Sequence, residues 1–143
     1  MATLERAIAI AATAHAGQKD RSGAPYILHP IRLMMGVESM ESKIVAVLHD
    51  VVEDTDWTFE RLRAEGFTDS VLTALDCVTR RETETYEEFV ERSRVNPIAR
   101  PVKLADLEDN MNVRRLDALK EKDLARLERY HRAWLRLRSA QAD

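Results

Sequence analysis

Residues 46–55 constrain this chain more than any other stretch. The segment begins with apolar residues and ends with four ionisable ones: His49, Asp50, Glu53 and Asp54. Residues four apart share a helix face, so we expect His49 to lie over Glu53. Asp50 should lie over Asp54 in the same way. Because buried charges are costly without a partner, the segment predicts a bound divalent cation with further ligands supplied from elsewhere in the chain.

The chain has only four glycines and four prolines in 143 residues, so it contains few signals that would end a helix. This scarcity favours long helices over a many-stranded sheet. Hydrophobic residues make up 45% of the chain, which is enough for one core. We therefore predict an all-α protein with one domain.

Charge and cysteine content exclude several classes of protein. The 22 basic and 25 acidic residues are mixed along the chain, which argues against a nucleic-acid-binding protein. Cys77 is the only cysteine, which excludes an internal disulfide and fits a reducing cytoplasm. The N-terminal residues do not form a leader pattern, and no apolar run is long enough to span a membrane. We expect a soluble cytoplasmic protein of undetermined oligomeric state.

Helix-start signals divide the chain into segments. The predicted caps are Thr3, Thr58, Thr68, Thr85 and Asn96, and Thr85 begins a capping-box pattern. The first helix should end near residue 16, and the third should start near residue 41 and carry the 46–55 segment. The last helix should span residues 122–140. Its expected core residues are Leu124, Leu127, Trp134 and either Leu135 or Leu137.

Three further residues have chemistry suited to metal binding. His29 precedes Pro30, which suits the first turn of a helix and restricts the His29 backbone. It could equally be a histidine that contacts the core at a helix entry. Asp106 is suspicious for a surface acid because mostly apolar residues surround it between positions 102 and 107. His15, near the end of the first helix, is better suited to a capping or supporting role.

The residues alone therefore suggest a mixed imidazole and carboxylate site. Its members are His29, His49, Asp50 and Asp106, with Glu53, Asp54 and Asn110 close by. Such a set suits Mn²⁺, Fe²⁺ or Mg²⁺ better than a closed structural zinc site. Four protein ligands would leave about two octahedral positions open, as a metal-assisted hydrolase requires. Because His-Asp pairs also occur by chance, the residues leave this hypothesis and a purely structural one equally open.

Three motifs in order extend the argument: Tyr26-Ile27-Leu28-His29-Pro30, Leu48-His49-Asp50-Val51-Val52-Glu53-Asp54-Thr55, and Val102-Lys103-Leu104-Ala105-Asp106 with Asn110. Together they resemble the HD-domain phosphohydrolase superfamily over roughly residues 5–135. More narrowly, the chain resembles the (p)ppGpp 3′-pyrophosphohydrolases, both the hydrolase half of bifunctional alarmone synthetase/hydrolases and the small alarmone hydrolases. The resemblance implies a compact HD domain of about seven or eight helices over residues 1–143.

The resemblance also implies roles for individual residues. The Mn²⁺ ligands would be His29, His49, Asp50 and Asp106. Glu53 and Asp54 would bind and activate the attacking water. The loop 18–23, with Lys19 and Arg21, would contact the base, and Asn110, Arg126 and Tyr130 would contact the nucleotide. The implied reaction cleaves the 3′-diphosphate of (p)ppGpp and releases pyrophosphate with GDP or GTP.

Two departures from the family pattern keep alternatives open. Asp20 stands where a basic residue is common, and Glu108-Asp109 makes the segment before Asn110 more acidic than usual. An acidic pocket rim repels a pyrophosphorylated ligand, so an adenine alarmone or another nucleoside phosphate is an alternative substrate. A non-catalytic alarmone-binding domain is a third hypothesis. The presence of Glu53 and Asp54 argues against it, because a sensor could dispense with both.

Overall fold

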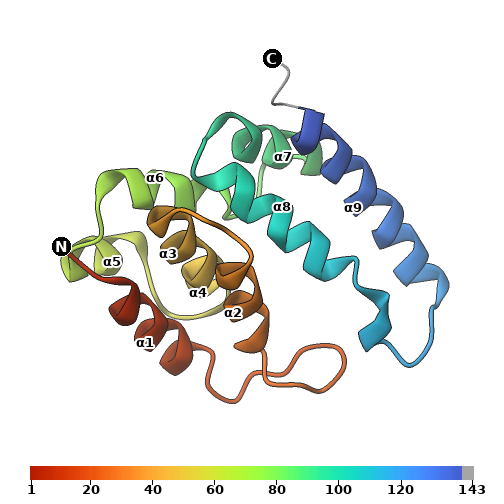
Figure 1. Cartoon of the computed structure of the whole chain (residues 1–143), viewed down its shortest axis with the longest axis horizontal. Coiled ribbons are helices and arrows are strands. Elements are labelled where there is room, and N and C mark those ends of the chain that lie inside the picture. The colour runs from red at the N-terminus through yellow and green to blue at the C-terminus, as the bar shows by residue number, and fades with distance from the viewer. Residues whose placement is uncertain (140–143) are drawn as a thin grey trace.

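The computed structural model describes residues 1–139, which fold into helices joined by loops (Figure 1). Four predicted caps each accept the backbone N–H three residues further on: Thr3, Thr58, Thr68 and Thr85. The Glu88 carboxylate in turn accepts a hydrogen bond from the Thr85 N–H, which completes the capping box. The Asn96 side chain accepts from the N–H groups of Ile98 and Ala99. Local sequence therefore sets most helix starts.

The helices are α1 (Leu4–Ala14), α2 (Leu28–Met35), α3 (Met40–Leu48), α4 (Val51–Asp54), α5 (Phe59–Glu65), α6 (Asp69–Cys77), α7 (Tyr86–Val95), α8 (Ala99–Asn110), the 3₁₀ turn η1 (Val113–Arg115) and α9 (Glu121–Ser139). Counting the one-turn α4 with α3 gives eight α-helices among the described residues. No strand forms within residues 1–139, where the only bridge joins Lys19 and Pro25. The all-α prediction is confirmed.

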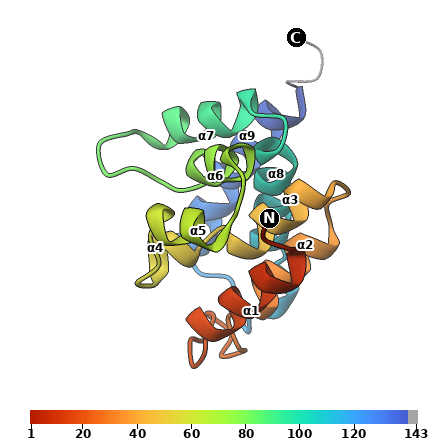
Figure 2. The same cartoon turned by 90° about the vertical axis from the view of Figure 1, so that its left-hand side faces the viewer.

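The second half of helix α3 lies at the centre of the molecule because it is apolar on every side. Residues 44–48 are all buried, as expected for a helix surrounded by others. Helices α1, α2, α6 and α8 pack around it. In Figure 2, α1 and α2 lie below this helix and α6 lies above it. The 46–55 segment therefore emerges from the most protected part of the fold.

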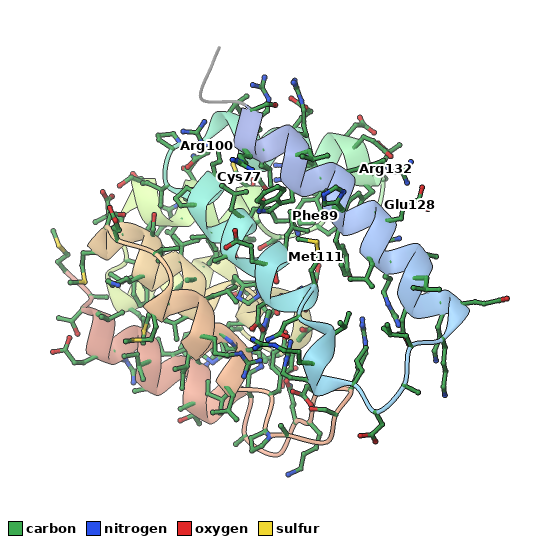
Figure 3. The ribbon with its side chains drawn as sticks, turned by 45° about the vertical axis from the view of Figure 1, so that its right-hand side comes forward. Cys77, Phe89, Arg100, Met111, Glu128 and Arg132 are labelled. Carbon is green, nitrogen blue, oxygen red and sulfur yellow. The ribbon has the colours of Figure 1, made fainter. Side chains whose placement is uncertain are left out.

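Helix α9 covers α7 and α8 and closes a second, smaller core. This core contains Val90, Leu107, Ala133 and Leu137. Figure 3 shows Phe89 and Met111 between α8 and α9, whereas Glu128 and Arg132 lie on the outer side of α9.

The prediction for the last helix was partly wrong. Leu124 and Leu135 are 54% and 48% exposed, whereas Leu137 is buried. Because α9 packs mainly against α7 and α8, its buried face is narrow. The described part of α9 ends at Ser139, and the predicted end at residue 140 lies outside the described residues.

Two other boundaries differ from the sequence expectation. Helix α1 ends at Ala14 because the chain turns through His15 to Gly17, whose φ is +86°. Helix α2 begins at Leu28, so His29 lies within the first turn rather than before it. Pro30 is tolerated there because the first N–H groups of a helix have no intrahelical partner.

Arg92 on α7 holds the loop that follows α6. Its guanidinium binds both Glu84 carboxylate oxygens, with Nε 2.8 Å from Oε2. It also donates to the carbonyl oxygens of Asp76 (2.6 Å) and Thr79 (2.8 Å). Lysine has one compact ammonium group and cannot make all these bonds at once.

We therefore expect Arg92→Lys to lower the free energy of unfolding by about 1–3 kcal/mol, because it leaves half-buried acceptors without donors. Urea unfolding followed by circular dichroism measures the change. Arg132→Lys on the exposed face of α9 is the matched control and should leave the midpoint unchanged. Equal midpoints for Arg92→Lys and the unaltered chain would contradict this role.

Candidate metal centre

The helix carrying the 46–55 segment breaks between His49 and Asp50. The His49 N–H bonds back only to Ala46 O at 3.4 Å, and Asp50 adopts φ −107° and ψ 2° before α4 restarts. The prediction that His49 lies over Glu53 on one continuous helix is therefore wrong. The break sends the two neighbouring side chains into different groups.

His49 turns into the protein and meets two residues distant in sequence. The donor atoms of His29, His49 and Asp106 all lie within 4.8 Å of one another. His29 Nε2 is 3.1 Å from Asp106 Oδ1, and His49 Nε2 is 3.8 Å from the same oxygen. The two imidazole centroids are 5.1 Å apart. Helices α2, α3 and α8 thus each bring one side chain to a single point.

Asp50 joins this group to the nearby acids. Its Oδ2 lies 2.8 Å from His49 Nε2 and also accepts a hydrogen bond from the Tyr26 hydroxyl. Carboxylate oxygens of Asp50, Glu53 and Asp54 lie within 4.8 Å of one another. The expected proximity of Asp50 and Asp54 is therefore present.

The donor set fits a divalent cation. Ligands at right angles around an ion with metal–ligand bonds of about 2.1 Å lie about 3 Å apart. The separations of 2.8, 3.1 and 3.8 Å around His49, His29 and Asp106 are close to this value. Two imidazoles with two carboxylates suit an intermediate or hard ion. The arrangement is a candidate metal site.

The charged groups of the site shift one another's pKa values. Burial disfavours the ionised form of Asp106, but Lys103, His29 and His49 together hold its pKa below the usual range. Burial likewise opposes protonation of His49, yet the Asp50 carboxylate raises its pKa to about 9. The pKa of Glu53 is raised by burial and by the charges of Asp50 and Asp54.

Three supporting residues were not identified as site residues from the sequence. Lys103 is buried, with Nζ 3.2 Å from Asp106 Oδ2 and 4.4 Å from the Phe89 ring centroid. Asp109 accepts a hydrogen bond from His29, and Tyr26 donates one to Asp50. Lys103 and Asp109 lie three residues before and after Asp106, so helical spacing was a usable signal for both.

A pocket of about 390 Å³ opens beside the metal centre. It is lined by residues from the 19–26 loop, α2, the α3–α4 junction, α8, η1 and α9: Lys19, Asp20, Arg21, Ser22, Tyr26, His29, Asp50, Glu53, Asp54, Asp106, Asn110, Asn112, Arg115, Leu116 and Tyr130. Of the predicted substrate contacts, Lys19, Arg21, Asn110 and Tyr130 are included. Arg126 is not among them, and its guanidinium donates to Asp123 at 2.7 Å.

Asp20 and Glu108, two acidic departures from the family pattern, both have hydrogen-bond partners within the protein. Asp20 Oδ1 accepts from the N–H groups of Ser22 and Ala24, and Oδ2 lies 3.6 Å from Arg115. Glu108 faces α9 and accepts from Trp134 at 3.0 Å. These acids stabilise the loop and the helix packing, so they add less negative charge to the pocket than the sequence suggests.

Comparisons with known proteins agree with this geometry. No protein-family model matches the chain. The chain is 31% identical over 120 residues to a guanosine-3′,5′-bis(diphosphate) 3′-pyrophosphohydrolase of Aquifex aeolicus, covering 76% of this chain and 17% of that protein. It is 34% identical over 126 residues to a GTP pyrophosphokinase of Streptomyces coelicolor, covering 78% of this chain and 15% of that protein.

The chain is homologous to a segment of these enzymes. The resemblance to the (p)ppGpp 3′-pyrophosphohydrolases predicted from the motifs is thereby confirmed. A solved metazoan SpoT orthologue, described as hydrolysing ppGpp, superposes with a TM-score of 0.78 at 24% identity. The match covers 96% of this chain and 85% of the orthologue, and it shows that the fold is shared.

We expect the chain to bind one Mn²⁺ ion and to be stabilised by it. A metal that binds only the folded state adds about 2.7 kcal/mol at one hundred times its Kd. Asp106→Asn should abolish this gain, whereas His131→Ala on the exposed face of α9 should retain it. Titration calorimetry and thermal melting with and without EDTA give the measurement. Equal stabilisation of Asp106→Asn and the unaltered chain would rule out the site.

We also expect Asp54→Asn to lower the pKa of Glu53. Burial and the Asp50 and Asp54 charges disfavour ionised Glu53, so removing one charge lets it lose its proton at lower pH. Carbon-13 NMR of the side-chain carboxyl in the metal-free protein measures the shift. Asp56→Asn is the neighbouring control. An unchanged or higher Glu53 pKa in Asp54→Asn would show that the two acids do not interact.

Proposed function

We propose that the chain hydrolyses the 3′-diphosphate of a guanosine alarmone, (p)ppGpp, and releases pyrophosphate with GDP or GTP. The observation that carries this proposal is the meeting of His29, His49 and Asp106 next to the pocket that Asp50, Glu53 and Asp54 line. Similarity to a named pyrophosphohydrolase supports the choice of substrate. Because the chain spans only 17% of that relative, the argument depends on the site as well as on the similarity.

The proposed metal is a single Mn²⁺ held by His29, His49, Asp50 and Asp106. When bound, the ion lowers the pKa of a coordinated water and offsets negative charge on phosphate oxygens. The protein's own contribution is to bring the four donors together from α2, the α3–α4 junction and α8. The Tyr26 hydroxyl supports this arrangement by holding the Asp50 carboxylate from the pocket side.

Glu53 is the proposed general base. It lines the pocket, and its raised pKa brings it closer to the operating pH than an ordinary glutamate. Glu53 would take the proton of the water that attacks the 3′-linked phosphorus. The bond from that phosphorus to the ribose 3′ oxygen then breaks, the 3′ oxygen takes up a proton from solvent, and Glu53 returns its proton to water. Asp54 supports Glu53 by keeping its pKa raised.

The pocket offers basic and aromatic groups for the nucleotide. Lys19 and Arg21 on the loop would face the base and the phosphates of the nucleotide. Asn110 on α8 and Tyr130 on α9 would approach the nucleotide from these two helices. The volume of about 390 Å³ is of the size that takes one small-molecule ligand.

We propose that residues 1–143 act as one HD hydrolase domain in the cytoplasm. Within the described residues no helix is long and apolar enough to cross a bilayer.

A release assay separates this proposal from its competitors. The chain is incubated with ppGpp, ppApp or GTP, with and without Mn²⁺, and products are resolved by ion-exchange chromatography. Mn²⁺-dependent pyrophosphate release from ppGpp supports the proposal, and preference for ppApp would reassign the base. Orthophosphate release from GTP would indicate a general nucleotide hydrolase, and binding without turnover would indicate a sensor.

Because one relative is named a GTP pyrophosphokinase, the chain is also incubated with ATP and GTP to test for ppGpp synthesis.

Glu53→Gln should reduce kcat for pyrophosphate release by about 10²–10⁴-fold, because the amide cannot accept a proton. Mn²⁺ affinity should remain within threefold of the unaltered chain, since Glu53 is not a proposed ligand. Glu60→Gln, on exposed α5, is the matched control with full activity expected. A fall of less than tenfold with metal still bound would remove Glu53 from this role.

A further inference from the structure

Asp109 lies outside the proposed ligand set, yet it makes a direct contact with one of its members. Its Oδ2 is 2.6 Å from His29 Nδ1, on the side of the imidazole away from the metal centre. A carboxylate has only acceptor oxygens, so Nδ1 must carry the proton of this hydrogen bond. In the neutral ring, Nε2 then presents its lone pair, and Nε2 is the atom that lies 3.1 Å from Asp106.

The Asp109 carboxylate is itself fixed by two arginines. Arg32, one turn after His29 on α2, binds it in a bidentate manner, with Nε 2.7 Å from Oδ1 and Nη2 3.0 Å from Oδ2. Arg115 of η1 donates to the Asp109 carbonyl oxygen at 2.8 Å and lies 3.4 Å from Oδ2. Bidentate arginine pairs fix orientation as well as charge, so the carboxylate has little freedom to rotate.

Burial protects the contact between His29 and Asp109 from water. The side chains of His29 and Asp109 are only 7% and 11% exposed, which limits how well water can replace either partner. Arg115 also lines the pocket and lies 3.6 Å from Asp20 of the 19–26 loop. The same carboxylate therefore contacts elements on the metal side and on the nucleotide side of the site.

We propose that Asp109 is a positioning residue that sets the tautomer and orientation of His29 for metal binding. This role rests on the metal function proposed above for His29. It gives a reason for an acid at position 109, where the sequence departs from the family pattern. Outer carboxylates that orient a ligating histidine typically contribute 10–100-fold to metal affinity.

The test measures Mn²⁺ affinity by titration calorimetry for three test variants, one control variant and the unaltered chain. Asp109→Ala should lose about 10–100-fold in affinity, because the ring is no longer held. Asp109→Asn keeps an oxygen that accepts from Nδ1, so it should recover part of that loss. Arg32→Ala removes the ion pair between α2 and α8 but leaves the contact with His29, and it should change affinity less than threefold. Glu108→Ala, the neighbour that faces α9, is the control.

A purely structural role gives a different pattern. If Arg32→Ala weakened Mn²⁺ binding as much as Asp109→Ala, the ion pair and not the imidazole contact would be responsible. Asp109→Ala within threefold of the unaltered chain would also overturn the proposal. Failure of the unaltered chain to bind Mn²⁺ would contradict the proposed function itself, which distinguishes the two failures.

A second measurement needs no variant. Nitrogen-15 NMR of the imidazoles in the Zn²⁺-loaded chain, with Zn²⁺ as a diamagnetic substitute, reports which His29 nitrogen carries hydrogen. We expect a protonated Nδ1 coupled to a slowly exchanging, downfield proton, and a metal-bound Nε2. Metal on Nδ1 would overturn the proposal even if every variant folded poorly.

Discussion

The Asp106 carboxylate lies inside a helical bundle, where burying a charge without partners would cost roughly several kcal/mol. It is accommodated by four side chains on α2, α8 and the end of α3: Lys103 and Asn110 donate to its oxygens, and the imidazoles of His29 and His49 lie 3.1 and 3.8 Å from Oδ1. These partners reach it only if α2, α3 and α8 pack as they do. Ala99 and Val102 on α8 pack into the main core with α3, and Asp106, four residues after Val102, lies on the same helix face. The fold and the candidate site therefore depend on the same helix packing.

The break in the helix after Leu48 explains how adjacent residues can serve two functions. In a continuous helix, neighbouring side chains point about 100° apart. Glu53 would then lie on the same face as His49, and Asp54 on the same face as Asp50. The turn at Asp50 instead leaves His49 in the core with His29 and Asp106, while Asp50 faces the pocket with Glu53 and Asp54. A metal ligand group and an acid group thus meet within six residues.

Sequence could predict the parts of this structure that depend on local interactions. The threonine caps, the buried central helix and the candidate ligands were recognisable because capping and apolar patterning act within a few residues. The helix break was not, because no glycine or proline between residues 46 and 55 marks it. The side chain of Asp50 instead pairs with Tyr26, which is distant in sequence. Arg126 was misplaced for a similar reason, because the rotation of α9 about its own axis depends on tertiary packing. Burial of Ala133 and Leu137 sets this rotation, and the charged residues of α9 gave no signal of it.

The positions of Asp20 and Asp109 show where composition is a poor guide to pocket charge. Both looked like repulsive acids on a rim, yet each is paired with arginine, and Asp109 also contacts a histidine. Helical spacing could place Asp109 on the Asp106 face, but only the tertiary fold brings Arg32 and Arg115 to it.

The one-turn helix α4 has a consequence for how the site tolerates different phosphate geometries. Its only buried residue is Val51, whereas His49 two positions earlier is enclosed by the core. Segments with few buried apolar contacts open and adjust at lower free-energy cost than the core. In the proposed mechanism, the residue that would bind the cation is therefore enclosed by the core, whereas Glu53, which would accept the proton, lies on a one-turn helix that can adjust at lower free-energy cost.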